Sequence, residues 1–176
     1  GGLLAVNGMS FDLVENEVLG LIGPNGSGKT TMINLISGAI KATDGNIRLF
    51  NQNITKTSPT NIARLGIART FQIVRILPTL SVLENVAAGG VFGYDRRWGA
   101  SLEEHSRHML SRVGLENAEH APVDSLTYID QKRLELARAL VSDPRILLLD
   151  EWLAGLNPTE LLTGIDLIKE LRSDGR

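Results

Sequence analysis

Polar and apolar residues follow two patterns along the chain, one typical of strands and one typical of helices. Short apolar runs, or apolar residues alternating with polar ones, predict β-strands. These stretches are residues 10–14, 17–22, 46–50, 67–72 and 145–149. Helices are predicted mainly where apolar residues recur at helical spacing. The helical stretches are residues 30–40, 61–65, 101–113, 132–140 and 159–171.

The pattern also divides the chain into two parts. Between residues 75 and 140 helical segments follow one another without a strand, starting at Ser81, a predicted N-cap whose capping box is completed by Glu84. On either side, strands and helices alternate. We therefore expect an α/β core formed by residues 1–74 and 141–176, interrupted by a helical subdomain at 75–140.

Composition narrows the class of protein. The chain has 176 residues, 43% of them hydrophobic, which is enough for one α/β domain with a subdomain. The net charge of −2 provides no broad basic field, so we expect no nucleic acid partner. The absence of cysteine excludes disulfides and thiolate metal sites and suits a reducing cytosol. No apolar run approaches the roughly 18 residues that span a bilayer, so we expect any membrane association to come through a partner.

A glycine-rich segment at 23–30 carries the clearest chemistry. It reads Gly-Pro-Asn-Gly-Ser-Gly-Lys-Thr and fits G-x-x-x-x-G-K-[ST], a phosphate-binding loop, between a predicted buried strand and a predicted helix. Gly23, Gly26 and Gly28 allow positive φ and close approach to a ligand. The loop N–H groups and the helix N-terminus bind anions. The candidate nucleotide-binding residues are Asn25, Gly26, Ser27, Gly28, Lys29, Thr30 and Thr31.

Several side chains in and near this loop are candidates for catalysis and for binding Mg²⁺. Lys29 can reach the β- and γ-phosphates, and the Thr30 hydroxyl can ligate Mg²⁺. Asp150 and Glu151 follow the predicted strand at 145–149, where Asp150 can hold Mg²⁺ through its water shell and Glu151 can polarise the attacking water. Gln72 ends another strand, at the edge where ligands bind in α/β sheets, and can touch the metal or that water. Each motif taken singly has a simpler explanation. The loop could be a glycine-rich turn that binds nothing, Asp150-Glu151 an acidic turn and Gln72 a solvated amide. Their combination in one chain favours the functional interpretation.

A histidine pair offers a second, weaker metal candidate. His105 and His108 lie three residues apart and share a helical face. A zinc site needs at least a third ligand, and the sequence provides none nearby. We therefore expect these histidines on a solvated face.

Taken together, these motifs resemble the ATP-binding-cassette (ABC) ATPases, the motor subunits of ABC transporters. The resemblance rests on the phosphate loop, the Gln72 segment, a signature at 126–131, the Asp150-Glu151 strand and the turn at 154–157. Segments 5–11, 66–72, 133–140 and 154–158 look like the ATPases of branched-chain amino acid importers. The resemblance implies a P-loop NTPase (RecA-like) core with an inserted helical subdomain and a small antiparallel β part.

The family's biology gives further expectations. It implies a peripheral subunit on the cytoplasmic face of the inner membrane, hydrolysing ATP with Mg²⁺. Two ATPase subunits, identical or homologous, would sandwich two ATP molecules and drive transmembrane permease subunits. Glu151, Gln72 and Lys29 would be catalytic, and Thr30, Gln72 and Asp150 would hold Mg²⁺. Thr127 would contact the nucleotide from the signature.

The chain also departs from the family pattern. In the signature, Thr127 replaces serine but keeps a hydroxyl, and Ile129 replaces a glycine that approaches the γ-phosphate. Trp152 stands where proline is usual. The family's adenine-stacking aromatic would precede Gly1, and its γ-phosphate-sensing histidine would follow Arg176. We therefore expect a segment truncated at both ends, or a degenerate copy.

Three functions remain open. The first is ATP hydrolysis in an importer. The second is a module that binds nucleotide without turnover, which Ile129 and the missing histidine favour. The third is an ABC ATPase of DNA repair or translation, which the net charge and the importer-like segments disfavour.

Overall fold

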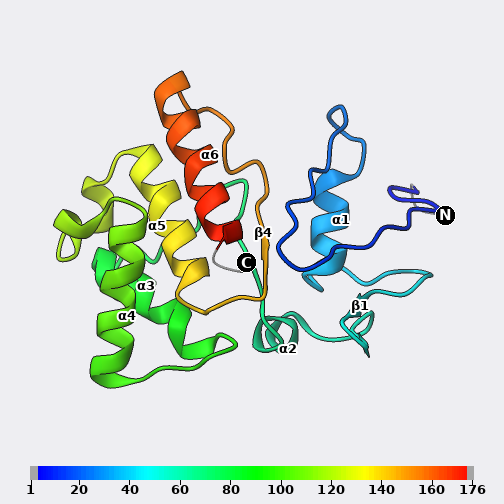
Figure 1. Ribbon diagram of the computed structural model, residues 1–176, viewed down its shortest axis with the longest axis horizontal. Helices are drawn as coiled ribbons and strands as arrows, with labels where there is room; N and C mark the ends of the chain where they lie inside the picture. The colour runs from blue at the N-terminus through cyan, green and yellow to red at the C-terminus, as the bar shows by residue number, and fades with distance from the viewer. Residues whose placement is uncertain (1–3, 174–176) are drawn as a thin grey trace.

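The computed structural model describes residues 4–173, so Gly1 and Arg176, the predicted outer limits of the core, lie outside the described residues. The helices are α1 (Lys29–Ile36), α2 (Pro59–Arg64), α3 (Val82–Phe92), α4 (Gly99–Arg112), α5 (Tyr128–Leu140) and α6 (Pro158–Ser173). Two 3₁₀ turns, Glu116–Ala118 and Val123–Ser125, join α4 to α5. The strands are β1 (Arg48–Leu49), β2 (Gln52–Asn53), β3 (Ile67–Arg69) and β4 (Ile146–Leu148). In Figure 1, β4 runs between α1 on one side and the helices α3 to α6 on the other.

The strands form two small sheets. β1 and β2 pair antiparallel, with Arg48 opposite Asn53 and Leu49 opposite Gln52. A small antiparallel β part is what the resemblance implied. β3 and β4 pair in parallel, with Ile67 opposite Ile146. The parallel pair is part of the predicted α/β core, and its two strands end at the same edge.

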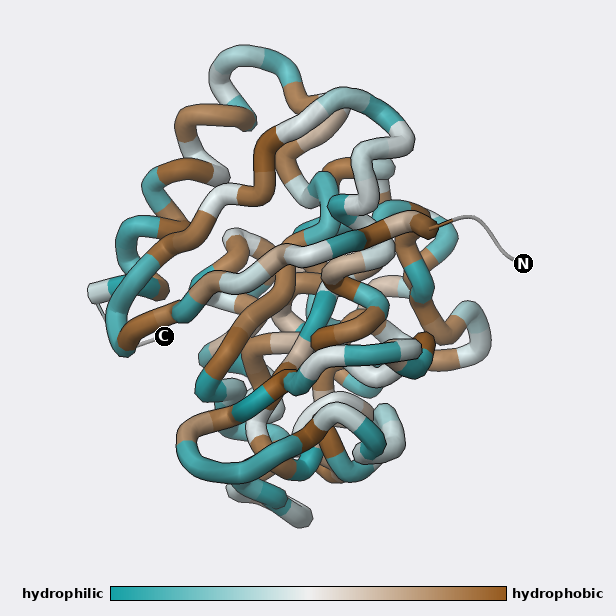
Figure 2. Tube along the Cα trace, turned by 90° about the vertical axis from the view of Figure 1, so that its right-hand side faces the viewer, coloured by the Kyte–Doolittle hydropathy of each residue, from teal (hydrophilic) through white to brown (hydrophobic). Residues whose placement is uncertain are grey.

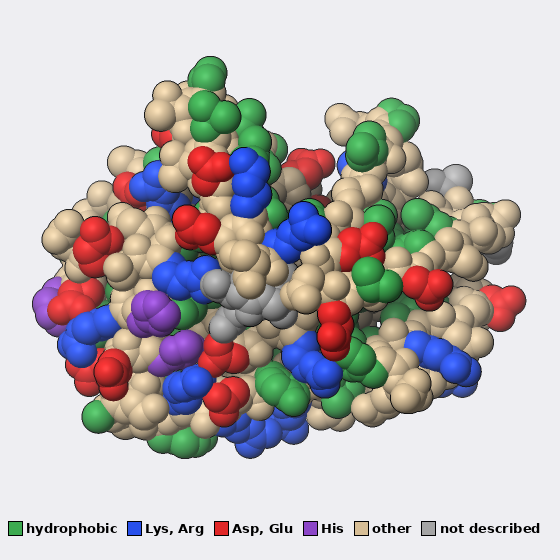
Figure 3. Space-filling model, in the orientation of Figure 1, with side chains coloured by type: hydrophobic (Ala, Val, Ile, Leu, Met, Phe, Trp, Pro, Cys, Tyr) green, Lys and Arg blue, Asp and Glu red, His purple; other side chains and the backbone are tan. Residues whose placement is uncertain are grey.

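The predictions of strands at 10–14 and 17–22 are wrong for the described residues. Neither stretch forms a ladder with another strand, and Ile22 is 97% exposed although a buried strand was expected. A strand satisfies its backbone groups only through a neighbour, and among residues 4–173 no strand pairs with this segment. Figure 3 shows hydrophobic side chains on the surface of the part of the molecule that contains the N-terminal segment and α1.

Helix boundaries follow local signals. Ser81 caps α3 in the predicted capping box, accepting from the Glu84 N–H while Glu84 accepts from the Ser81 N–H. Thr127 caps α5, which therefore begins four residues earlier than the predicted position 132. α1 ends at Ile36 rather than at 40, because Gly38 takes a φ of +71° that leaves the helical region.

Two hydrophobic clusters hold the molecule together, and Figure 2 shows brown segments crossing the middle of the molecule as well as outer loops. The larger cluster joins α3, α4 and α5, and it also takes Trp152 and, from α6, Leu167 and Leu171. The smaller contains Leu49, Ile54, Ile62 and Ile67. Among residues 4–173, no helix combines the length and apolarity that crossing a membrane requires.

Candidate functional site

The glycine-rich loop at 23–30 is shaped to bind an anion. Gly26 and Gly28 have φ of +81° and +94°, and a Cβ on Gly28 would lie 2.6 Å from the carbonyl oxygen of Ala5. Gly23 does not take the positive φ we expected; a Cβ there would lie 2.6 Å from Ser27 Oγ. Gly28 precedes α1, no side chain caps that helix and its first turn holds no acidic residue. The N–H groups and positive end of α1 are therefore available to phosphate.

Lys29 lies in this loop as predicted, but it bonds to the loop itself. Its ammonium donates to the carbonyl oxygens of Gly23 at 2.8 Å and Pro24 at 3.0 Å. These acceptors are neutral, and a phosphate oxygen would be a stronger, charged partner. The contacts thus hold the ammonium over the loop, within reach of a bound phosphate.

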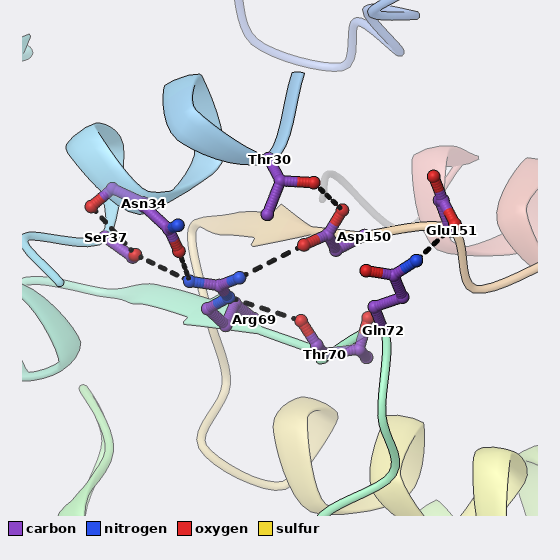
Figure 4. A network of polar contacts seen from close by, with 8 residues as sticks. All are labelled: Thr30, Asn34, Ser37, Arg69, Thr70, Gln72, Asp150 and Glu151. Carbon is purple, nitrogen blue, oxygen red and sulfur yellow. Dashed lines mark hydrogen bonds and ion pairs between the residues drawn. The ribbon is translucent and has the colours of Figure 1, made fainter. Parts of the chain in front are cut away.

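The candidate metal ligands Thr30 and Asp150 are in contact. Thr30 Oγ1 donates to Asp150 Oδ1 at 3.4 Å, although 120 residues separate them in the sequence. Asp150 is 3% exposed and lies just beyond the end of β4, while Thr30 is the second residue of α1. Figure 4 shows the two side chains facing each other across the space between α1 and β4.

Gln72 and Glu151 also come together. Gln72 Nε2 donates to Glu151 Oε2 at 2.9 Å, and both side chains are exposed. The backbone of Glu151 has a φ of +51°, which is uncommon for a residue with a side chain and is found at functional sites. The bond uses the amide nitrogen of Gln72, so its amide oxygen is the atom suited to a metal.

Parallel pairing explains this convergence. β3 and β4 run in the same direction, and the Thr70 N–H extends the ladder by donating to the Leu148 carbonyl at 2.9 Å. The residues that follow each strand therefore meet at one edge, the position where ligands bind in α/β sheets. Gln72 follows β3, and Asp150 and Glu151 follow β4.

The donor set fits Mg²⁺ better than a transition metal. Within residues 4–173, no group of three or more His, Cys, Asp or Glu side chains could hold an ion by itself. Mg²⁺ is usually held by one or two protein oxygens together with phosphate and water. A hydroxyl and a carboxylate in mutual contact at the end of a phosphate loop match that requirement.

Sequence reasoning missed Arg69, which bonds to Asp150. Its guanidinium donates to Asp150 Oδ2 at 3.2 Å and to Asn34 Oδ1 at 2.7 Å (Figure 4). A charged residue within the predicted strand at 67–72 was the available signal.

The signature residues make only local contacts within this chain. Thr127 Oγ1 accepts from the Asp130 N–H at 3.3 Å and donates to Asp130 Oδ2 at 2.6 Å. None of these contacts reaches the phosphate loop, which is connected to α1 on the other side of β4 in Figure 1. Ile129 lies inside α5 and is not among the residues with positive φ. The backbone here therefore does not require glycine, and isoleucine adds the bulk of its side chain.

Trp152, the second departure from the family pattern, is bonded to α5. It is 5% exposed, and its indole N–H donates to the Lys132 carbonyl at 3.1 Å. Lys132 is buried, and its ammonium donates back to the carbonyls of Trp152 at 3.1 Å and Ala154 at 2.6 Å. Burial lowers the pKa of Lys132, against the opposing charges of Glu135 and Glu151. The turn after Glu151 is thus bonded to α5 in both directions: Trp152 donates to α5, and Lys132 of α5 donates to the turn.

Glu135 ties α5 to the segment after Gln72. This buried carboxylate accepts from the Arg75 N–H at 3.2 Å, and Arg138 donates to the Arg75 carbonyl. Burial raises the pKa of Glu135, while the N–H groups of Arg75 and Phe71 oppose the shift.

The expectation of a solvated face for the histidine pair is wrong for His105. Its side chain is largely buried, and Nε2 lies 3.0 Å from Asp143 Oδ2. His108 is exposed as expected, and the two ring centroids are 6.4 Å apart. Asp143 lies after α5, in the loop that leads to β4, and its contact with His105 accounts for the burial of that side chain. The periodicity of α4 alone could not predict a contact with a residue outside that helix.

Comparison with known proteins places these motifs in one family. The profile of the ABC transporter family matches residues 6–154. The chain is 41% identical to the high-affinity branched-chain amino acid transport ATP-binding protein LivG of Salmonella typhimurium, over 98% of this chain and 73% of that protein. It is 40% identical to the corresponding protein BraF of Pseudomonas aeruginosa, over 99% and 73%.

Solved structures agree with that placement. An ATP-binding cassette of an ABC transporter in its ADP conformation has a TM-score of 0.87 and 30% identity, over 97% of this chain and 72% of that one. A dimeric cassette bound to ADP and phosphate after hydrolysis has a TM-score of 0.84 and 27% identity, over 94% and 74%.

Proposed function

The chain belongs to the ABC transporter family of ATP-binding cassettes, and we propose that it binds MgATP and hydrolyses it as the motor subunit of a branched-chain amino acid importer. The observation that carries the proposal is the meeting of three elements at one sheet edge. The phosphate loop, the Thr30–Asp150 contact and the Gln72–Glu151 contact all lie there. The names of the relatives LivG and BraF supply the transported class.

Each side chain has a role in this proposal. The loop N–H groups of residues 25–31 and the Lys29 ammonium bind the phosphates. Thr30, Asp150 and Gln72 would hold Mg²⁺, which neutralises phosphate charge in the transition state. Glu151 accepts the proton of the attacking water, and Gln72 holds that carboxylate in place.

Partners follow from the same family. A second ATPase subunit is proposed, because a similar cassette is a dimer after hydrolysis. Thr127, which bonds to Asp130 rather than to its own phosphate loop, would contact the nucleotide of that second subunit. We also propose that residues 75–140 form a subdomain facing permease subunits, with the core at 1–74 and 141–176. The protein would then lie on the cytoplasmic face of the inner membrane.

One observation favours a second function, nucleotide binding without turnover. Ile129 lies in the first turn of α5, so it adds side-chain bulk at the helix N-terminus where the family pattern has glycine. We accordingly expect the 176-residue chain alone to release negligible phosphate from ATP. Phosphate release that is substantial and disappears in Glu151→Gln would contradict this.

Calorimetry with MgATP tests the binding step. We expect Lys29→Ala to weaken binding by about tenfold or more, because a charge beside the phosphates is lost. Lys169→Ala is the matched control, since Lys169 is exposed on α6 and pairs with Asp166 on the same helix at 2.9 Å. Equal affinity of the parent and Lys29→Ala would overturn the proposed site.

A further inference from the structure

Arg69 joins three parts of the candidate site. Its side chain is 10% exposed. One terminal nitrogen donates to Asn34 Oδ1 at 2.7 Å and to Ser37 Oγ at 3.2 Å, both on or next to α1. The other donates to Asp150 Oδ2 at 3.2 Å. Figure 4 shows this fork lying between α1 and the end of β4.

The two oxygens of Asp150 therefore have different partners. Oδ2 faces Arg69 and Oδ1 faces Thr30 at 3.4 Å. A carboxylate held at one oxygen keeps the orientation of the other. In this geometry the held oxygen is the one away from the phosphate loop, and the oxygen facing Thr30 is the one in position to bind a cation.

Arginine is suited to this task because its planar fork donates in several fixed directions. The plane is fixed further by the Phe71 ring, whose centroid lies 4.5 Å from the guanidinium carbon. Arg75 stacks on the same ring at 4.3 Å and has an exposed side chain. The two arginines thus share one contact but differ in burial and surroundings.

We propose that Arg69 is a positioning residue that couples α1 to Asp150 and so sets how strongly Mg²⁺ enhances nucleotide binding. The inference rests on the proposed function, because it assumes that the loop binds a nucleoside triphosphate. Arg69 touches neither nucleotide nor metal in this account. It acts through Asp150 and through the helix that carries Thr30.

The readout is the ratio of the ATP dissociation constants measured in EDTA and in excess Mg²⁺. In Arg69→Met we expect this ratio to fall by about tenfold, because removing a side chain that orients a metal ligand typically weakens metal binding about tenfold to a hundredfold. Affinity for ATP in EDTA should stay at the parent value, since the loop is unchanged. Arg75→Met is the control and should keep the parent ratio.

Opposite results have distinct meanings. A ratio in Arg69→Met that equals or exceeds that of the parent would overturn the inference. A larger ratio would indicate that the Arg69 guanidinium acts only by repelling Mg²⁺. An equal loss of affinity with and without Mg²⁺ would also overturn it, because that is the effect of a purely structural link to α1. If the parent binds no ATP in either buffer, the proposed function fails and the inference fails with it.

Two further variants separate position from charge and guard against misfolding. Arg69→Lys keeps the charge but donates from one atom, so we expect a ratio between those of the parent and Arg69→Met. A fully parent-like ratio in Arg69→Lys would overturn the positioning role.

In an Asp150→Asn background, adding Arg69→Met should change the ratio no further if Arg69 acts through Asp150. An additional loss there would contradict this pathway.

Discussion

Apolar residues are buried in the large cluster of α3, α4 and α5 but exposed in the segment at 17–22 that leads to the phosphate loop. Residues of α3 and α5 such as Val86 and Leu136 have no exposed surface. By contrast, Val18, Leu19 and Ile22 in the segment before the loop are exposed. Helices satisfy their own backbone and need only one face covered, whereas a strand also needs a neighbour along its edge.

The difference affects the site directly. The carboxylate side of the site is linked to the large hydrophobic cluster through Trp152 and the β4 region. The phosphate-loop side is joined to the carboxylate side by the polar bonds that Thr30, Asn34 and Ser37 make with Asp150 and Arg69. Its helix α1 packs Ile36 against the smaller cluster, not the larger one. We therefore expect substitutions on the two sides to affect stability very differently.

Leu136→Ala against Ile22→Ala is the sharpest test of that contrast. Leu136 is fully buried, so its truncation should lower the free energy of unfolding by about 2–5 kcal/mol. Ile22 is exposed, and its truncation should change that free energy by no more than about 0.5 kcal/mol. Denaturant unfolding of both variants measures the difference. A large loss in Ile22→Ala would mean that the segment is covered in solution.

The link between the carboxylates and α5 should have the next largest effect. Trp152→Phe removes the N–H that donates to the Lys132 carbonyl and leaves space beside Gly164. We expect a loss of about 1–3 kcal/mol in unfolding free energy. Trp98→Phe is the control, because Trp98 is 65% exposed and should be neutral. Equal stability of the two variants would show that the bonds between Trp152 and Lys132 do not stabilise the fold.

Gly28→Ala should separate function from stability on the loop side. Alanine at a φ of +94°, with its Cβ directed at the Ala5 carbonyl, disfavours the native loop by about 1–2 kcal/mol. Because few hydrophobic contacts depend on the loop, the melting temperature should fall only slightly while ATP binding is lost. Retained ATP affinity in calorimetry would show that the loop tolerates a different backbone.

The smallest effect is a pH dependence at Glu135. Burial raises its pKa in the folded protein above the ordinary 4.5, so the unfolded chain ionises first as pH rises. The protonated form of Glu135 therefore contributes to the free energy of unfolding. This contribution is fully present below pH 4.5, the ordinary pKa, and is lost as pH rises through the pKa of the folded protein. Glu135→Gln keeps an oxygen for the Arg75 N–H and cannot ionise. Its stability relative to the parent should therefore increase as pH rises above the ordinary value of 4.5; a constant difference would contradict the assignment.

Sequence reasoning succeeded where the signal was local. Helix positions followed from periodicity and from caps such as Ser81. Motif spacing selected the phosphate loop, Gln72, Asp150 and Glu151, which the structure brings together, while their roles stay predictions. The prediction failed at 17–22, because an apolar run does not reveal whether a neighbouring strand is there to pair with it. Arg69 and the Lys132–Trp152 bonds were missed for the same reason, since contacts across 81 and 20 residues leave no periodic trace.

The placement of Trp152 also gives the protein an optical property. Of its two tryptophans, Trp98 faces water and Trp152 is enclosed next to Glu151. Water-soluble quenchers such as iodide should therefore extinguish the long-wavelength emission of Trp98 and spare the short-wavelength emission of Trp152. The remaining fluorescence would come from one indole fixed between α5 and the carboxylate turn. Its intensity would report movement of that turn when a nucleotide arrives, without any attached dye.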